Sequence, residues 1–239
     1  MMVKASTTWV RDGVPFLKDE HIEAKALLLL EEYAQTGNWQ VSAPVPVEDI
    51  IELHLKLGFG IEDLRVLLGV DDVLGAIWLK TKEIRVDVRL DPSNNPNLLG
   101  RYRFTLAHEV GHWRLHRPYY QEDTNQDELF DGRGQPSFIC RSSMKPRPEW
   151  QADFFAGCLL MPRDVVRSAW RDWRGNLEPV TVKQLPTVAL YAEAKRNENA
   201  TMERFCRPLA DQFEVSAEAM RIRLEELKLL FRRLPDMLF

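Results

Sequence analysis

The feature that most constrains this chain is the pentapeptide His108-Glu109-Val110-Gly111-His112, which has the pattern H-E-x-x-H. It lies in a stretch with helical periodicity, residues 103–116, and positions four apart on a helix lie one turn above each other. Two imidazoles at this spacing can bind one metal ion from one face of the helix. Glu109 follows the first imidazole directly and can reach a water bound to that metal. The pattern therefore favours a metal-binding helix over a surface helix that carries histidines by chance.

A second helical segment, residues 149–162, carries two carboxylates four residues apart, Glu149 and Asp153. A catalytic zinc typically takes three protein ligands and leaves one position for water. Glu149 is predicted to be the third ligand. Asp153 is predicted to accept the free ring N–H of a ligating histidine and so to set its tautomer. Without the histidine motif, both carboxylates would be interpreted as part of a solvated helix face.

These segments resemble the ImmA/IrrE family of metallopeptidases, a compact branch of the zincins. Residues 100–112, followed by Leu115-His116, are similar to the core helix of the family. Residues 149–162 are similar to its second signature, and residues 44–51 resemble its entry helix. The resemblance covers roughly residues 40–165.

The resemblance implies zinc on His108, His112 and Glu149, with Glu109 as the catalytic glutamate. The family often has Asn where Asp153 stands, and this departure moves the site toward the Glu-x-x-x-Asp pattern of the thermolysin group. The resemblance to the family also implies that the substrate is a helix-turn-helix repressor, often encoded beside the peptidase in mobile elements or toxin–antitoxin-like pairs. Cleavage of such a repressor would change transcription after a stress signal.

His116 extends the histidine series by four more residues. Three histidines in successive turns of a straight helix cannot all reach one ion, since the outer two are about 12 Å apart along the axis. His116 is therefore expected beside the metal site or in the core. Cys140 is expected to be an ordinary thiol rather than a thiolate that caps the zinc and silences the enzyme. Peptide hydrolysis passes through an oxyanion, and besides the metal a second hydrogen-bond donor usually stabilises it. The sequence offers four candidates without ranking them: Arg103, Tyr119, Tyr120 and Tyr191.

Periodicity along the chain predicts an α+β fold with a small, mostly antiparallel sheet packed against helices, and the family resemblance implies that this is a zincin-like domain. Helical extensions are expected at both ends, with boundaries at residues 1–40, 41–170 and 171–239. Helices are predicted at 18–35, 47–57, 163–170, 187–196, 202–213 and 216–231, and strands at 59–64, 74–79 and 83–88, with a polar connector at 171–179. Residues 117–147 are expected to be an irregular loop, either bordering the substrate cleft or forming a surface insertion.

Composition narrows the class of protein. The 239 residues carry a net charge of −4 with a pI near 5.8, so a strong attraction to nucleic acid is not expected. No apolar stretch approaches the length needed to cross a bilayer, and the N-terminus has no secretory signal pattern. Three widely spaced cysteines favour a reducing cytoplasm over a disulfide framework.

Three functions remain open from the sequence. The first is a zinc endopeptidase that cleaves a regulator, and the second is a metal-containing partner that binds a repressor or toxin without cutting it. The third is a DNA-binding regulator that uses the C-terminal helices, residues 205–230, where Arg221, Arg223 and Arg232-Arg233 add positive charge. Intact ligands and an intact catalytic glutamate favour the first function.

Overall fold

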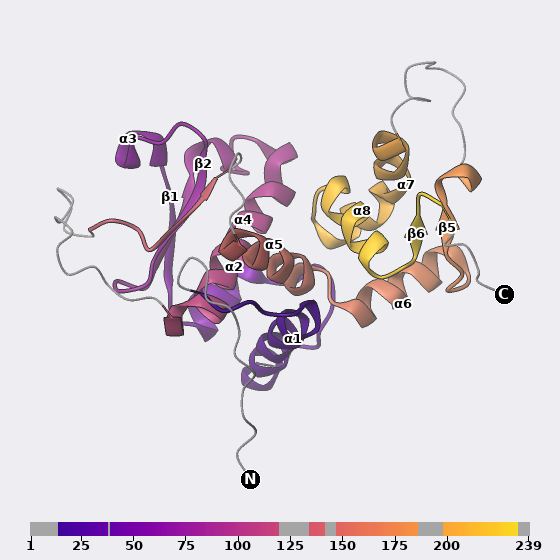
Figure 1. Cartoon of the computed structure of the whole chain (residues 1–239), viewed down its shortest axis with the longest axis horizontal. Coiled ribbons are helices and arrows are strands. Elements are labelled where there is room, and N and C mark those ends of the chain that lie inside the picture. Colours follow the sequence, from indigo (N-terminus) through magenta and orange to yellow (C-terminus); the bar gives the residue numbers. More distant parts are fainter. Residues whose placement is uncertain (1–13, 38, 120–133, 142–146, 186–197, 234–239) are drawn as a thin grey trace, which may run out of the picture. The chain divides into compact units, whose positions relative to one another are not determined.

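The structure, a computed structural model, describes residues 14–37, 39–119, 134–141, 147–185 and 198–233. The chain divides into two compact units, Met1–Gln40 with Pro46–Leu159, and Val41–Val45 with Leu160–Phe239. Helices and a small sheet occur together in the first unit (Figure 1), so the predicted α+β class is confirmed.

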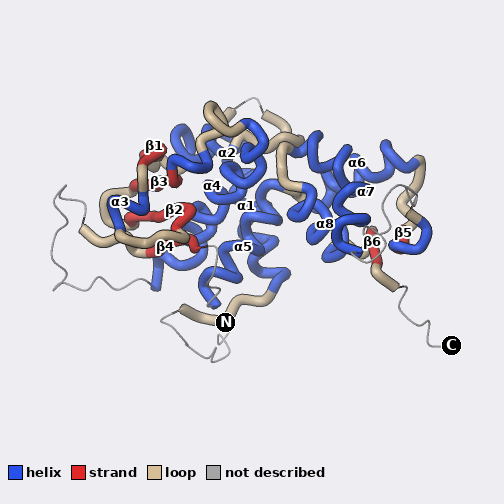
Figure 2. Tube along the Cα trace, turned by 90° about the horizontal axis from the view of Figure 1, so that it is seen from above, coloured by secondary structure: helices blue, strands red, loops and turns tan. Residues whose placement is uncertain are grey.

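The first unit contains a four-stranded sheet whose strand order is β1-β3-β2-β4 (Figure 2). Its strands are β1 (Gly58–Glu62), β2 (Val73–Trp78), β3 (Glu83–Asp87) and β4 (Phe138–Arg141). β1 is parallel to β3, and the other two pairings are antiparallel, as predicted for a mostly antiparallel sheet. The expectation of an irregular loop throughout 117–147 is wrong at β4. Phe138-Ile139-Cys140-Arg141 is a short strand-forming run that pairs with the distant β2, and this pairing is not visible in the local sequence.

The helices of this unit are α1 (Asp19–Thr36), α2 (Val47–Asp49), α3 (Leu64–Leu68), α4 (Leu99–Gly111) and α5 (Arg147–Leu160). Two π-helical turns continue them: η1 (Ile50–His54) after α2, and η4 (His112–His116) after α4. Short 3-10 turns occupy Val88–Leu90, Pro96–Leu98 and Arg117–Tyr119. The predicted helix at 103–116 is therefore one continuous helical segment with a wider last turn.

α4 packs closely against the sheet and against α5. A Cβ added to Gly75 in β2 would come within 2.6 Å of Thr105 Cγ2 on α4, so this position has room only for glycine. A Cβ added to Gly111 would lie 3.0 Å from the Cα of Ala152 on α5. Glycine thus lets two helices and a strand approach closely at the level where the histidine motif begins.

The second unit is mostly helical, with α6 (Arg163–Arg174), α7 (Glu198–Phe213) and α8 (Ala217–Glu226). β5 (Val180–Thr181) and β6 (Leu230–Phe231) form a parallel pair, with a 3-10 turn at Val182–Gln184. Ser216 caps α8 as predicted, because its hydroxyl oxygen accepts the N–H of Ala219 at 3.0 Å. Among the described residues, no helix has the length and apolar character that crossing a membrane requires.

Two sequence predictions in this unit are wrong. The polar connector expected at 171–179 begins later, because α6 continues to Arg174 and Gly175 ends it in the left-handed conformation. The last helix stops at Glu226 rather than continuing to 231. Lys228 has a φ of 58°, and Leu230 then pairs with Val180 in the two-stranded sheet. The predicted helix at 187–196 lies outside the described residues.

Candidate metal centre and catalytic site

The two histidines of the motif lie in the same buried helical segment. His108 is in α4 and His112 begins η4, and their side chains are 1% and 0% exposed. Their Nε2 atoms are 3.1 Å apart. Helical spacing therefore brings two ring nitrogens to one point, as the pattern predicts.

α5 brings Glu149 to the same point. Its Oε2 lies 3.1 Å from His108 Nε2, and its Oε1 lies 3.2 Å from His112 Nε2. Ligands that bind one tetrahedral zinc at 2.0–2.1 Å are themselves roughly 3.3 Å apart. The three side chains thus form a triangle of nearly the size that one such ion needs.

The charge states in this triangle also suit a cation. Burial alone would raise the pKa of Glu149, but the neighbouring rings of His108 and His112 outweigh it and lower that pKa to about 2. Burial lowers the pKa of His112 to about 3. Burial would also lower the pKa of His108, but Cys140, Asp153 and Glu149 raise it well above 6.5. In the metal-free protein a proton on His108 therefore supplies the positive charge at this position, and a bound metal would displace it.

Asp153 holds the ring of His108 from the other side. Asp153 lies one turn after Glu149 on α5, and its Oδ1 accepts a hydrogen bond from His108 Nδ1 at 2.9 Å. With its proton on Nδ1, a neutral His108 presents a bare Nε2 to the triangle. The carboxylate pair predicted from the sequence thus lies on the side of α5 that faces His108.

Glu109 is a buried carboxyl group without a hydrogen-bond partner among the described residues. It is 0% exposed, and neither carboxyl oxygen has a hydrogen bond within the described part of the chain. Burial raises the pKa of Glu109 to about 8, with His108 lowering it and Glu149 raising it. A buried carboxyl group without a partner is costly, so it indicates a site built for a group that is not part of the protein.

The sequence of this region matches one protein family. A profile of the IrrE N-terminal-like domain, Peptidase_M78, matches residues 81–225, more than half of the chain. The chain belongs to the IrrE N-terminal-like peptidase family. The ImmA/IrrE resemblance is thereby confirmed, and membership supports peptidase activity with a protein substrate.

Other comparisons add little to this assignment. A search of curated proteins found none that matches the chain. Among solved structures, a Mycobacterium tuberculosis transcriptional regulator is similar over 87% of this chain, with 13% sequence identity and a TM-score of 0.46. The chain spans about half of that protein's length, 52%.

In this family member, β4 contributes two residues that sequence reasoning did not place at the site. The ring of Phe138 stacks on His112, with centroids 4.2 Å apart and planes 14° apart. Cys140 is buried, and its Sγ lies within 4.8 Å of ligand atoms of both His108 and Glu149. Burial raises the pKa of the Cys140 thiol. The apolar run at 138–140 was the signal available in the sequence.

Of the four candidates for a second oxyanion donor, the two that the structure describes differ in their exposure to solvent. Arg103 is buried, and its Nη1 lies 3.8 Å from a carboxylate oxygen of Glu48. Tyr119 is 47% exposed. Tyr120 and Tyr191 lie outside the described residues.

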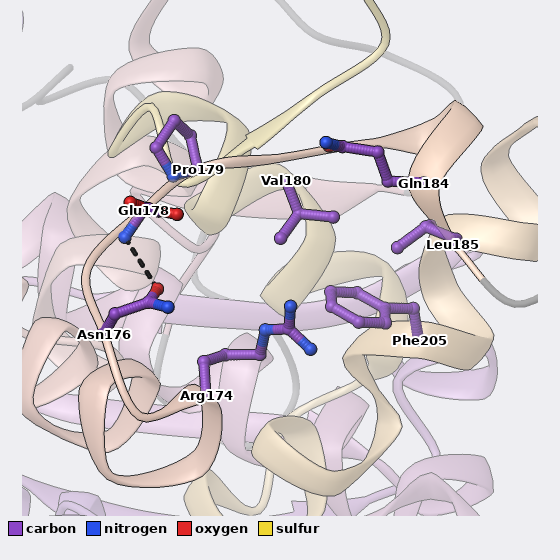
Figure 3. Close-up of a pocket in the computed structure, with 8 residues that line it drawn as sticks. All are labelled: Arg174, Asn176, Glu178, Pro179, Val180, Gln184, Leu185 and Phe205. Carbon is purple, nitrogen blue, oxygen red and sulfur yellow. Dashed lines mark hydrogen bonds between the residues drawn. The ribbon is translucent and has the colours of Figure 1, made fainter.

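A separate cavity of about 250 Å³ lies in the second unit (Figure 3). Its lining includes the guanidinium of Arg174 and the ring of Phe205, which make a cation–π contact at 5.7 Å. Beside it, Asn176 accepts the backbone N–H of Glu178 at 2.9 Å. No histidine or cysteine is among its described lining residues, so it offers no ligand set like that of α4 and α5.

Proposed function

We propose that this protein is a zinc-dependent endopeptidase in which His108, His112 and Glu149 hold the metal and Glu109 is the catalytic acid and base. The observation that carries the proposal is a set of three contacts of 3.1 to 3.2 Å, one between the two Nε2 atoms and one from each of them to a different carboxylate oxygen of Glu149. Beside them lies the buried carboxyl group of Glu109, which has no hydrogen bond among the described residues. Two nitrogens and one oxygen from protein side chains are typical of a catalytic zinc site.

When bound, zinc polarises the scissile carbonyl and lowers the pKa of a coordinated water toward about 7. Glu109 accepts the proton of the attacking water and then donates it to the leaving amine. Its pKa near 8 in the metal-free protein lies close to the range that both steps need, and a nearby cation would lower it. Asp153 keeps His108 in one orientation during both steps.

The substrate we propose is a helix-turn-helix repressor encoded near this protein, as the family resemblance implies. Direct DNA binding by the C-terminal helices has less support, because two of the four arginines that would contact phosphate are buried and paired. Arg221 is 6% exposed and pairs with Glu203 and Glu225. Arg223 is 2% exposed, and its Nε donates to the carbonyl of Met161. Buried, paired arginines are unavailable to a nucleic-acid backbone.

The test is incubation of the zinc-loaded protein with the repressor encoded beside it, followed by intact-mass analysis. We expect two fragments with the wild-type protein and none with Glu109→Gln, which keeps all three metal ligands and should still bind zinc. Glu20→Gln, at an exposed position of α1, is the matched control and should cleave normally. If Glu109→Gln changes transcription as the wild type does, the protein acts by binding its partner without cleavage, and the proposed reaction is wrong.

A further inference from the structure

A chain of buried polar groups leads away from His112 on the side opposite the metal triangle. His112 Nδ1 lies 2.9 Å from His116 Nδ1, and His116 Nε2 lies 3.0 Å from Gln151 Oε1. Gln151 Nε2 then donates to the backbone carbonyl of Pro15 at 3.0 Å. All three side chains are at most 1% exposed, so water does not compete for these bonds.

The far end of this chain determines the direction of every bond in it. A backbone carbonyl only accepts, so the Gln151 amide nitrogen faces Pro15 and the amide oxygen faces His116. An amide oxygen also only accepts, so His116 carries its proton on Nε2. The ring of His116 is buried, and its described hydrogen-bond contacts are His112 and Gln151, with no carboxylate to balance a charge, so the neutral form with Nδ1 as an acceptor fits this environment. His112 must then donate from Nδ1, and its Nε2 is bare.

That bare nitrogen is the atom that faces the triangle, 3.1 Å from His108 Nε2 and 3.2 Å from Glu149 Oε1. A neutral His108 would reach the same state through a single contact, with Asp153. Among the described contacts of His112, Nδ1 has no carboxylate acceptor. It faces His116 instead, and His116 is hydrogen-bonded to Gln151. The π-helical turn at His112–His116 is where the two rings meet.

We propose that His116 and Gln151 are positioning residues that hold His112 in the Nδ1–H tautomer, with the Pro15 carbonyl setting the direction of the hydrogen bonds. The ligand role of His112 rests on the proposed function, whereas the tautomer is a property of the metal-free chain. The N-terminal segment that supplies Pro15 is held on the first turn of α5, since the guanidinium of Arg147 lies 5.5 Å from the ring of Phe16. The segment before α1 is thus part of the metal site's support.

The direct test is nitrogen-15 NMR of the imidazole rings in the metal-free, full-length protein. We expect His112 protonated on Nδ1 and His116 protonated on Nε2. If His112 is protonated on Nε2, or exchanges between both tautomers, the proposal is wrong, whether or not the protein cleaves anything. This measurement needs no variant and no bound metal.

A variant separates positioning from packing. Gln151→Met keeps the length of the side chain but removes both hydrogen bonds, so His112 should populate both tautomers. Zinc affinity, measured by chelator competition, should fall about 10- to 100-fold. Gln35→Met, the same change at an exposed position of α1, should leave both readouts unchanged.

A second pair of variants concerns His116. His116→Asn can restore a donor and an acceptor and should bind zinc more tightly than His116→Phe. Equal zinc affinity in Gln151→Met and wild type, or in the two His116 variants, would overturn the proposal. A wild-type protein that shows the expected tautomers and binds zinc without cleaving the repressor would refute the proposed reaction alone.

Discussion

Replacing Gly111 with alanine tests whether the contact between α4 and α5 sets the size of the metal site. A Cβ at this position would lie 3.0 Å from Ala152 Cα, 3.2 Å from its carbonyl oxygen and 3.3 Å from its Cβ. Two of these atoms belong to the backbone of α5, so no side-chain rotation relieves the overlap. α5 must move away from α4, and Glu149, three residues before Ala152 on the same helix, moves with it.

The expected rise in the Kd for zinc follows from these distances. Ordinary contacts of a Cβ begin at 3.4 Å, so the shortfall at Ala152 Cα is about 0.4 Å. Metal–ligand distances tolerate deviations of only about 0.2 Å. Overpacking of this kind costs about 1–3 kcal/mol. If that cost falls on the metal-bound state, the Kd for zinc rises roughly 5- to 150-fold.

The assay is zinc affinity by chelator competition, together with urea unfolding of the metal-free protein. Gly157→Ala is the matched control, because Gly157 lies in α5 and a Cβ there would meet nothing within 4 Å. That control should bind zinc normally and gain about 0.5–1 kcal/mol of stability, since alanine is a better helix former than glycine. Should Gly111→Ala match Gly157→Ala in both measurements, the close contact does not set the site, and the reasoning fails.

Four further predictions concern single side chains at the site. Because the pKa of Glu109 is raised from 4.5 to about 8, its contribution to the stability of the metal-free protein is complete below pH 4.5 and is lost as pH rises through 8. The shift corresponds to about 5 kcal/mol of unfolding free energy. Urea unfolding between pH 4.5 and 8 should show this loss of stability in wild type and not in Glu109→Gln. Parallel stability–pH profiles of the two proteins would contradict the prediction. Asp153→Ala should weaken zinc binding about 10- to 100-fold while Asp153→Asn, which keeps an acceptor, weakens it less; equal Kd values for the two variants would show that the acceptor is irrelevant. Gly75→Ala puts a Cβ 2.8 Å from Glu109 Oε1, so cleavage should fall at least tenfold with zinc still bound, as metal content and intact mass would show together. Cys140→Ser should retain zinc, because three other ligands complete the site; loss of the metal would instead make the thiolate a ligand.

The pattern of candidate site residues is readable from the sequence because it depends on local geometry. His108 and His112 share a helix, and so do Glu149 and Asp153, and a spacing of four residues puts each pair on one side of its helix. Such spacing is set by the backbone hydrogen bonds of the helix itself, whatever packs around it. The resemblance to a known family added the expectation that the two helices meet, and in the structure Glu149 on α5 lies beside His108 and His112.

What the sequence does not reveal depends on contacts between residues far apart in the chain. β4 exists because it pairs with β2, more than 60 residues earlier, and Leu230 forms a strand instead of helix because Val180 offers it a partner. No sequence pattern identifies Gln151 as a site residue. Its proposed positioning role follows only from its contacts with His116 and with the carbonyl of Pro15, which is 136 residues away in the sequence. Local propensity is a weak preference, and a buried hydrogen bond to a distant partner overrides it, since leaving that polar group unpaired costs more than the preference is worth.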